Sequence, residues 1–530
     1  MLTMKRMFCC LLALVMVFTM VACGKEAPAA DAPSANDDAP AADQNVDSNG
    51  REYVELVAYN YVSGVGPGME ETMEAVNEYL KEKLNTTIDM HFYNAPDYSS
   101  TVGTVLSSGN YVDFVFTRST MVPFLQYANM NAFVPLNDYI DEYLPGTKAA
   151  LPEASWDAVT VDGQIYAVPL QRDAATRYDI TINTTMVEDL GIDMPESFDT
   201  YYDLTDFMYE AKAARDAKYP EKAGIPIVNT LLEYYQSYYY CEPILISQDW
   251  ILAANVPGLK GTAGMGEGET VFSPYLTEEY RELCKWRNQL VKDGIIPYED
   301  RYTYDADRVL QSAGEFLFEC NSGNVYVDED ANAPYYKSKL VTADHAVLAT
   351  NGYQHGYAIS TQSKHIERSL EVIDLFNTDP YLATLIRFGP EGVGWTDEDN
   401  DNVIELPDIN ADPTNRYWYH WYGWNLGGLT ISKTPPSSAA NFGELLAELN
   451  GSAVPGANIG FIMDTKPIEN ELAACMNVIT EYDGTLKWGQ IDNVDEYVDE
   501  FVQKLKDNGI EKIIAEGQSQ LDAWREANNK

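Results

Sequence analysis

The sequence predicts an α/β protein built around a mostly parallel, doubly wound sheet. Three strand-like runs, at 53–59, 87–93 and 112–117, alternate with stretches in which apolar residues recur at helical spacing. This β-α-β-α-β order is typical of parallel sheets whose faces are covered by helices. Since such sheets bind ligands beyond the carboxyl ends of their strands, we expect residues 59–68 and 117–120 to line a site.

The order of strands and helices follows from apolar spacing and from the residues that interrupt it. The first strand ends before the glycine-rich run 64–68, because glycine and proline break regular structure. The first helix is indicated by the spacing of Met73, Val76, Leu80 and Leu84. Near the end of the chain, apolar residues share one helical face across 494–505, and Asn508-Gly509 is a typical helix stop. Residues 510–524 continue as a second amphipathic stretch, and we expect both helices to pack against the body of the protein.

The charge balance excludes several classes of partner. The 530-residue chain has 35 Lys and Arg against 82 Asp and Glu, a formal net charge of −47. Nucleic-acid binding needs a basic face, so DNA and RNA are excluded, as is adsorption of the protein surface to an anionic membrane. The 5 histidines show no metal-ligand spacing such as HExxH, and we expect neither a metal nor a cofactor.

The first 50 residues are predicted to be a targeting segment and a tether. Two basic residues precede an apolar run at 7–21, which is short for a membrane span and has the length of a secretory signal. The run leads into MVACG, which resembles a bacterial lipobox and implies that residues 1–23 are a signal peptide with lipidation at Cys23. An ordinary secretory signal with an incidental cysteine is the alternative. Residues 24–50, rich in Ala, Pro, Asp and Ser, are expected to form a disordered tether.

The body of the chain holds four cysteines that are far apart in sequence: Cys241, Cys284, Cys320 and Cys475. They form no CxxC motif, so the pattern indicates neither a metal knuckle nor a redox motif. We expect isolated buried thiols rather than a disulfide framework, and the sequence leaves a disulfide between any two of them open.

Several short motifs occur in a fixed order along the body of the chain. Residues 161–169 read VDGQIYAVP, preceded by DFVF at 113–116 and followed by FGPEGVGW at 388–395 and GFIMD at 460–464. In this order and spacing they resemble the extracellular solute-binding proteins of ABC importers, notably the carbohydrate type and its large lipoprotein subgroup. The resemblance runs from the lipobox to the C-terminus.

The resemblance implies a periplasmic-binding-protein-like fold, in which two doubly wound α/β lobes are joined by a hinge of crossing segments and bind solute between them. It also implies an ABC permease as partner, a monomer, a lipid anchor in the membrane, and no catalytic residues. A first crossing is expected at 167–173, a second near 315–326 and a return near 376–395. Lobe 1 is expected to comprise 51–167 and about 322–375, and lobe 2 to comprise 168–321 and about 376–530.

Aromatic residues are the first candidates for solute contact, because an aromatic ring can cover the apolar face of a sugar. The densest patch, 417–424, contains three tryptophans beside glycines, and it is compatible with a binding loop or with a core strand. For the tyrosine-rich run 234–240, packing between the lobes is the alternative. The aromatic candidates are Tyr59, Tyr61, Tyr239, Trp395, Trp418, Trp421 and Trp424.

Charged side chains are expected to bind the hydroxyl rim of the solute through strong hydrogen bonds. The candidates are Arg118, just beyond the third strand, and Arg172 with Asp173, at the first crossing. The alternative for either arginine is a structural ion pair with one of the many carboxylates.

The acidic run DEDNDN at 397–402 has the oxygen-rich composition of a calcium loop. An EF-type loop needs glycine at its sixth place and glutamate at its twelfth, where this chain has Asn402 and Asp408. We therefore expect a solvated polar turn between strands, with calcium binding at 397–408 left open.

The leading interpretation is a receptor that captures a solute, expected to be an oligosaccharide, and delivers it to an ABC permease. A peptide or other small-solute receptor of the same fold is the alternative. The less favoured alternative is a surface glycoside hydrolase or lyase, which would need two carboxylates at catalytic separation. Because the chain has 82 acidic residues, their number does not exclude such a pair. The expected location is the extracytoplasmic face of the cell membrane, at the cell surface or in a periplasm.

Overall fold

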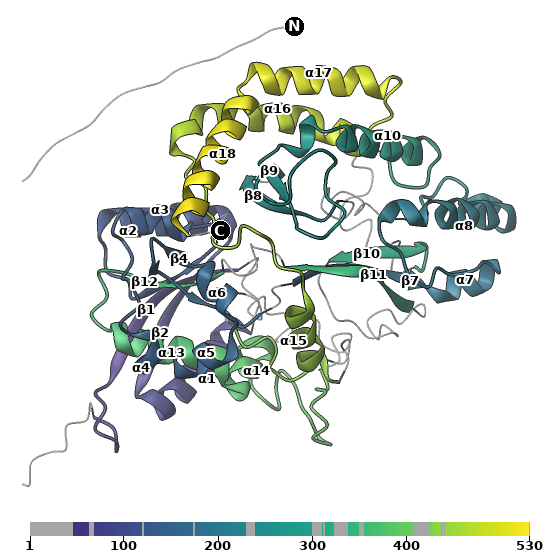
Figure 1. Cartoon of the computed structure of the whole chain (residues 1–530). Coiled ribbons are helices and arrows are strands. Elements are labelled where there is room, and N and C mark those ends of the chain that lie inside the picture. Colours follow the sequence, from purple (N-terminus) through teal and green to yellow (C-terminus); the bar gives the residue numbers. More distant parts are fainter. Residues whose placement is uncertain are drawn as a thin grey trace, which may run out of the picture.

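The computed structural model places the chain in two lobes, each with a large core of its own (Figure 1). The second lobe carries the C-terminal helices, shown in yellow, and the first lobe carries the N-terminal strands, shown in purple and blue. The structure describes residues 46–62, 68–118, 121–172, 175–228, 239–247, 249–298, 310, 313–322, 338–348, 355–406, 425, 427–435, 438 and 440–528.

The first lobe is built on a five-stranded sheet with the order β2-β1-β3-β12-β6. Its strands are β1 (Val54–Tyr61), β2 (Thr86–Tyr93), β3 (Phe114–Thr117), β6 (Val168–Pro169) and β12 (Gly356–Ile359). β1 runs parallel to β2 and β3, which confirms the β-α-β-α-β order predicted from the sequence, whereas β12 runs antiparallel to β3 and β6. The carboxyl ends of β1 and β3 therefore lie at one edge of the sheet.

Amphipathic helices cover this sheet. α1 (Met69–Leu84) buries Val76 and Leu80, on the face predicted from apolar spacing. α2 (Ala95–Ser108) begins after Asn94, whose side-chain oxygen caps the first turn by accepting a backbone N–H. The other elements of this lobe are α3 (Phe124–Asn129), α4 (Ile140–Tyr143), α5 (Pro145–Ala150), α6 (Glu153–Asp157), β4 (Thr160–Val161), β5 (Gln164–Ile165), α13 (Ile366–Thr378) and α14 (Pro380–Phe388).

The named strands of the second lobe are paired antiparallel. β7 (Ala175–Asn183) lies between β10 (Phe318–Ser322) and β11 (Ser338–Leu348). A separate hairpin is formed by β8 (Cys241–Ser247) and β9 (Asp249–Asn255). Because β7 directly follows the first crossing, the three-stranded sheet begins where the two lobes join.

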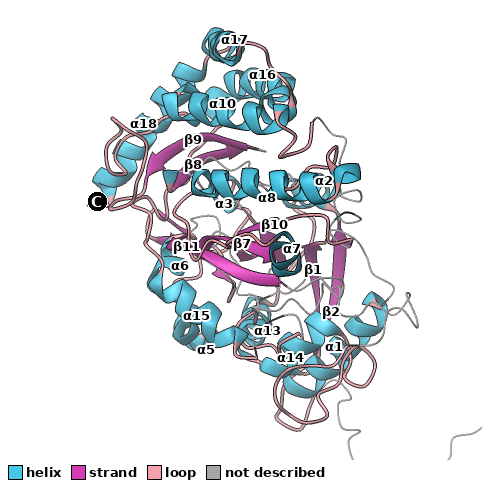
Figure 2. Cartoon of the chain, turned by 90° about the vertical axis from the view of Figure 1, so that its right-hand side faces the viewer, coloured by secondary structure: helices cyan, strands magenta, loops and turns pink. Residues whose placement is uncertain are grey.

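Helices cover the β8–β9 hairpin on the side away from the β7 sheet (Figure 2). α17 (Val494–Asp507) buries Phe501 and Leu505 on the face predicted from the sequence. α18 (Ile510–Ala527) begins after Gly509, whose φ of 97° confirms the predicted helix stop. The remaining helices described for this part of the chain are α7 (Thr184–Leu190), α8 (Thr205–Lys218), α10 (Glu278–Lys292), α15 (Phe442–Ser452) and α16 (Glu469–Trp488), with short 3₁₀ turns between them.

The chain first passes between the lobes after Leu170, which belongs to the first-lobe core, and before Ala175, which begins β7. This is close to the crossing expected at 167–173. A small third core, which we call the hinge core, lies at this junction and includes residues of α15. Its members are Ala158, Ala175, Leu429, Phe442, Leu446, Leu449 and Ile459.

The observed packing differs from the expected lobe boundaries in two places. β11 falls within the range 322–375 that was expected in lobe 1, but it pairs with β7 and its Val341 belongs to the second-lobe core. α14 falls within the range 376–530 that was expected in lobe 2, but its Leu382 packs in the first-lobe core. The second crossing, expected near 315–326, therefore lies later, between the end of β11 and the start of β12. Both outcomes depend on pairing with distant segments, which local apolar patterns do not report.

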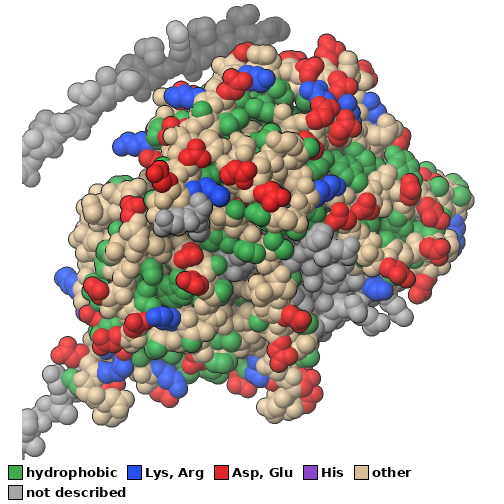
Figure 3. Space-filling model, in the orientation of Figure 1, with side chains coloured by type: hydrophobic (Ala, Val, Ile, Leu, Met, Phe, Trp, Pro, Cys, Tyr) green, Lys and Arg blue, Asp and Glu red, His purple; other side chains and the backbone are tan. Residues whose placement is uncertain are grey.

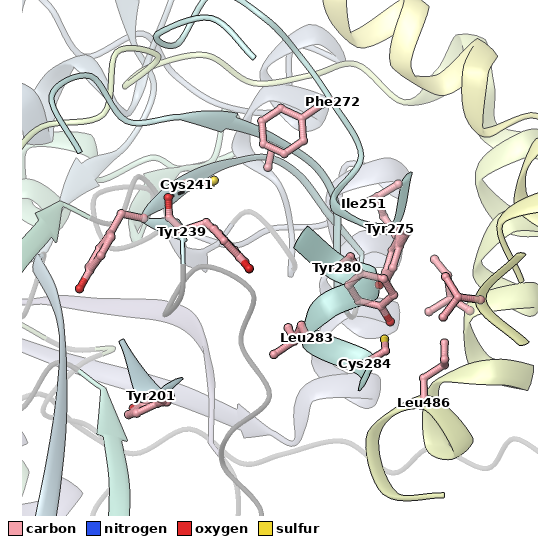
Figure 4. Close-up of a cluster of buried hydrophobic side chains, with 14 of the residues drawn as sticks. Tyr201, Tyr239, Cys241, Ile251, Phe272, Tyr275, Tyr280, Leu283, Cys284 and Leu486 are labelled. Atoms are coloured by element: carbon pink, nitrogen blue, oxygen red, sulfur yellow. Dashed lines mark hydrogen bonds between the residues drawn. The ribbon is translucent and has the colours of Figure 1, made fainter. Parts of the chain in front are cut away.

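The second-lobe core contains buried thiols. Cys241, Cys284 and Cys475 are free and buried, as the sequence predicted for them. Figure 4 shows Cys241 and Cys284 among aromatic and aliphatic side chains of this core. Burial raises the pKa of the Cys241 thiol to about 12. In the described part of the chain, no helix combines the length and the apolar composition needed to cross a membrane.

Candidate functional site

The carboxyl ends of β1 and β3 bring Tyr61 and Arg118 to one edge of the first-lobe sheet. β12 joins the sheet beside β3 with Gly356 opposite Thr117, so His355 lies next to Arg118 across the two strands. The first crossing leaves the sheet at the same edge, because β6 pairs with β12. Three segments that are far apart in sequence therefore meet where the lobes join.

Arg118, Arg172 and His355 form the group that we call the arginine–histidine cluster. Arg172 donates an N–H to Nδ1 of His355, and the Leu170 N–H donates to the His355 carbonyl oxygen at 3.2 Å. The pKa of His355 lies well below its usual range because the ring is buried and both guanidinium groups are near it. Burial, followed by the neighbouring Arg172, lowers the pKa of Arg118. At neutral pH the imidazole is therefore neutral beside two cationic groups.

A buried polar network lies beside this cluster. The Asn60 side chain, at the end of β1, donates to the Tyr357 hydroxyl at 2.8 Å. That hydroxyl donates in turn to the carbonyl oxygen of Asn425 at 2.9 Å, and the Asn425 side chain donates to the carbonyl oxygen of Tyr61. Because buried polar groups are costly unless they are hydrogen-bonded, this network fixes Asn425 to the carboxyl end of β1. Asn425 follows the tryptophan-rich run in the sequence.

A short ladder of rings runs along one face of β1 and β2. The Tyr59 ring stacks on His91 with a centroid distance of 4.8 Å and lies 6.0 Å from the Tyr93 ring. Tyr59 and Tyr61 share this face because side chains alternate along a strand. Both are partly exposed. Burial, and then the neighbouring Tyr93, raises the pKa of Tyr59.

Two aromatic candidates lie in cores instead. The Tyr239 side chain is 7% exposed in the second-lobe core, where its hydroxyl donates to the Glu279 carbonyl oxygen at 3.5 Å (Figure 4). Trp395 is 3% exposed in a small satellite core, and its indole N–H donates to the Gly389 carbonyl oxygen at 3.0 Å. These contacts are those of packing residues, so they do not support the expected solute contact for either side chain.

The structure therefore separates the expected site residues into three groups. Tyr59, Tyr61, Arg118 and Arg172 lie at or near one edge of the first-lobe sheet. Tyr239 and Trp395 are in cores. The candidates that fall outside the described residues, and whose roles stay predictions, are Cys23, Asp173, Trp418, Trp421 and Trp424.

The acidic run at 397–402 forms a turn closed by antiparallel pairing of Thr396 with Glu405. The carboxylates of Asp397, Asp399 and Asp401 have oxygen atoms within 4.8 Å of one another. However, Asp397 is ion-paired with Lys433, which holds the pKa of that carboxyl below its usual range. The described contacts are therefore those of an ion-paired polar turn, in line with the expected turn between strands.

Comparison with known proteins identifies the family. Residues 74–390, more than half of the chain, match the family of bacterial extracellular solute-binding proteins. The chain belongs to this family. Residues 458–526, which include α16, α17 and all but the last residue of α18, also match a domain of unknown function, DUF3502.

Two of the similar proteins cover most of this solute-binding protein, and a third covers less than half of it. A carbohydrate ABC transporter substrate-binding protein of Streptococcus pneumoniae serotype 4 is 25% identical over 475 residues, which span 86% of this chain and 88% of the relative. Lipoprotein LipO of Bacillus subtilis is 21% identical over 227 residues, which span 42% of this chain and 41% of the relative. The crystal structure of the N-glycan transport solute-binding protein NgtS from Streptococcus pneumoniae is 21% identical and covers 90% of this chain and 100% of its own, with a TM-score of 0.73. The structural likeness supports the two-lobed α/β fold.

Sequence reasoning did not find every residue of the edge where the lobes of the solute-binding protein meet. Three residues that lie there were missed: His355, Tyr357 and Asn425. His355 and Tyr357 are placed by the pairing of β12 with β3, and Asn425 is placed by its hydrogen bond from Tyr357. The GYAI run of β12 has the apolar character of a short strand, which is the one local signal that could have pointed to this region.

Proposed function

We propose that this solute-binding protein captures an oligosaccharide between its two lobes and delivers it to an ABC permease. Family membership supports solute capture, and the carbohydrate-transport relative supports the class of solute. Within the chain, the observation that carries the proposal is the arginine–histidine cluster. It places charged donors next to partly exposed tyrosines, at the sheet edge where the chain crosses to the second lobe.

The chemistry of this edge suits a sugar. Arginine donates several N–H groups in a fixed plane, which matches adjacent hydroxyl groups on a sugar ring. A tyrosine ring offers an apolar face to the C–H groups of the sugar and keeps a hydroxyl for hydrogen bonding. Arg118, Arg172 and Tyr61 are therefore the proposed contacts from the first lobe and crossing. We also propose that the solute contacts three tryptophans: Trp418, Trp421 and Trp424.

Capture is proposed to work by closure of the lobes. A solute that touches both lobes favours the closed arrangement by the difference between its affinities for the closed and open forms. The crossing segments act as the hinge, since they are the covalent connections between two separate cores. Closure buries the solute and brings the two lobe surfaces that a permease would recognise into one arrangement.

The proposal includes that the solute leaves unchanged, because solute-binding proteins deliver their cargo and perform no reaction on it. Incubation of the protein with a panel of oligosaccharides, followed by mass spectrometry, tests this part. We expect the input sugars alone. Shortened or unsaturated products would indicate a glycoside hydrolase or lyase instead.

The proposal also places the protein on the extracytoplasmic face of the membrane through a lipid on Cys23. The lipobox-like run MVACG supports this, as does the similarity to a lipoprotein. We expect the full-length protein expressed in a bacterial host to partition into detergent and Cys23→Ala to remain in the aqueous phase. Equal partition of both proteins would contradict lipidation at Cys23. More than one acyl chain is expected, because one chain alone binds a membrane only weakly and reversibly.

Calorimetric titration against oligosaccharides and peptides tests the site itself. Removal of Arg118 deletes charge-assisted hydrogen bonds of roughly 1.5–3 kcal/mol, so Arg118→Ala is expected to weaken oligosaccharide binding about tenfold or more. Arg281→Ala is the matched control, because Arg281 forms ion pairs with Asp499 and Asp495 on the outer surface of the second lobe. Equal affinity of wild type and Arg118→Ala would remove the cluster from the site. Binding of peptides instead of sugars would favour the alternative receptor class.

A further inference from the structure

The backbone of the first crossing, at the described residues 169–172 and 175, is hydrogen-bonded by side chains of two helices. Its carbonyl and N–H groups bond to two asparagine side chains, Asn377 on α13 and Asn450 on α15. Buried backbone N–H and C=O groups need hydrogen-bond partners, and these two side chains supply them.

Asn377 holds the first half of the crossing. It lies near the end of α13 in the first lobe and is fully buried. Its amide group donates to the carbonyl oxygen of Pro169 at 2.9 Å, and its Oδ1 accepts the N–H of Gln171 at 2.8 Å. The same amide also donates to the Thr147 hydroxyl at 3.3 Å, which fixes its orientation.

Asn450 holds the second half of the crossing. It lies near the end of α15, the helix that contributes to the hinge core. Its Nδ2 donates to the carbonyl oxygen of Arg172 at 3.0 Å, and its Oδ1 accepts the N–H of Ala175 at 3.1 Å. A single side chain thus bonds to the backbone of Arg172, a proposed solute contact, and to the backbone of Ala175, the first residue of β7.

The segment at 427–429 also bonds to the backbone of the first crossing. The N–H of Leu429 donates to the carbonyl oxygen of Gln171 at 3.1 Å, between the two asparagine contacts. Gly427 precedes it with a φ of 93°, and a Cβ at Gly427 would collide with Oδ1 of Asn377, the atom that accepts the Gln171 N–H. Glycine at 427 therefore allows this segment to lie against the crossing and its clamp.

We propose that Asn377 and Asn450 are positioning residues that form a two-sided clamp on the first crossing. The clamp holds the backbone at residues 169–172 and at Ala175, so that Arg172 keeps its place against His355 when the lobes move. This inference rests on the proposed function, because it concerns how the lobes close on a solute. It goes further by assigning a role in solute affinity to two residues outside the solute site.

The test compares three alanine variants of the full chain. Asn377→Ala and Asn450→Ala each remove one side of the clamp. Asn288→Ala is the matched control, because this buried asparagine also donates to a backbone carbonyl, that of Gly489 at 3.0 Å, but within the helices of the second lobe. Asn450→Asp is the conservative variant, since it keeps the acceptor for the Ala175 N–H and loses the donor to Arg172.

Hydrogen exchange measured by mass spectrometry, without any solute, tests whether the clamp protects the backbone of the crossing. We expect faster exchange in the peptide that contains Gln171 and Ala175 for both clamp variants, and wild-type exchange there for Asn288→Ala. For Asn450→Asp we expect slower exchange of this peptide than for Asn450→Ala, because the acceptor is retained. Wild-type exchange of this peptide in both alanine variants would overturn the clamp. A general rise across the second lobe, with no excess at the crossing, would also overturn it.

Calorimetric titration with the tightest-binding oligosaccharide then measures the effect of the clamp on solute affinity. Asn377→Ala and Asn450→Ala are expected to bind about tenfold more weakly than wild type, while Asn288→Ala binds as wild type does. Wild-type affinity in both clamp variants would overturn the positioning role. If the wild type itself bound no oligosaccharide or peptide, the proposed function would fail, whereas the exchange measurement would still decide whether the clamp exists.

Discussion

Glu242 on β8 is 1% exposed, and its carboxylate accepts three hydrogen bonds from the segment that enters the DUF3502 region. The bonds come from the Ala457 N–H at 3.0 Å, the Asn458 N–H at 3.3 Å and the Asn458 side chain at 2.8 Å. Arg525 on α18 is the charged neighbour, and it donates to the Asn458 side-chain oxygen at 3.0 Å. Burial nevertheless raises the pKa of Glu242 to about 7, because it outweighs these favourable contacts.

The raised pKa makes the stability of the second lobe depend on pH. An acid whose pKa is higher in the folded protein binds more protons when folded than when unfolded. Stability is therefore greatest below the ordinary pKa of 4.5 and falls as the pH rises through the folded value of about 7. Each pKa unit corresponds to about 1.36 kcal/mol, so ionisation of Glu242 lowers the free energy of unfolding by roughly 3 kcal/mol above this window.

Glu242→Gln removes this titration. The amide oxygen can retain the bonds from the Ala457 N–H and the Asn458 side chain, and the bond from the Asn458 N–H is lost at a cost of about 1 kcal/mol. At pH 8 we therefore expect the variant to be more stable than wild type by roughly 2 kcal/mol. At pH 5, where the wild-type carboxyl is protonated, we expect the two proteins to agree within about 1 kcal/mol.

Urea unfolding of the second lobe, followed at several pH values between 5 and 8, measures this difference. Glu526→Gln, which removes an acidic group from the exposed end of α18, is the control for the change in net charge. The reasoning would be refuted if Glu242→Gln kept the wild-type dependence of unfolding free energy on pH, or if the control lost it to the same extent.

Three further predictions concern close packing, thiol burial and the polar network. Gly456→Ala would place a Cβ against the Glu242 carboxylate, so we expect a loss of about 1–3 kcal/mol in urea unfolding, and an unchanged unfolding curve would contradict this contact. The thiols of Cys241 and Cys284 have pKa values raised by burial, so the folded protein at pH 8 should resist a thiol reagent, with full reaction expected only after unfolding. Rapid reaction of the folded protein would show that these thiols are accessible. Tyr357→Phe removes a buried hydroxyl with two hydrogen bonds, and a loss of about 1–3 kcal/mol in thermal unfolding is expected; a neutral effect would mean that the network adds no stability.

The sequence predicted the parts of the fold whose signal is local. The β-α-β-α-β order of the first lobe was visible because strand and helix periods differ, and Arg118 could be placed at a strand end for the same reason. The first crossing could be placed near its observed position because a family-like motif at 161–169 precedes it. The faces of α17 and α18 followed from apolar spacing alone.

The sequence did not predict the parts that depend on distant pairing. β11 joins β7 through a register that no local pattern reports, so its lobe was assigned wrongly. His355 reaches Arg172 only because β12 inserts between β3 and β6, and a single histidine gives no sign of this. Tyr239 and Trp395 lie in cores, and sequence alone does not distinguish an aromatic residue of a core from one on a binding surface.

The surface agrees with the charge counted from the sequence. Figure 3 shows acidic side chains spread over both lobes on the face in view, with fewer basic ones between them. The chain as a whole carries 82 acidic and 35 basic residues. Arg118 and Arg172, which both lie near the buried His355, therefore form a local cationic group in an acidic protein. This contrast is one reason why we propose them as solute contacts.

Small-angle X-ray scattering of the protein, alone and saturated with a bound oligosaccharide, measures lobe closure most directly. Two lobes that clamp a sugar predict a smaller radius of gyration and a lower maximum dimension in the saturated sample. An unchanged scattering curve at full saturation would contradict capture by closure of the lobes.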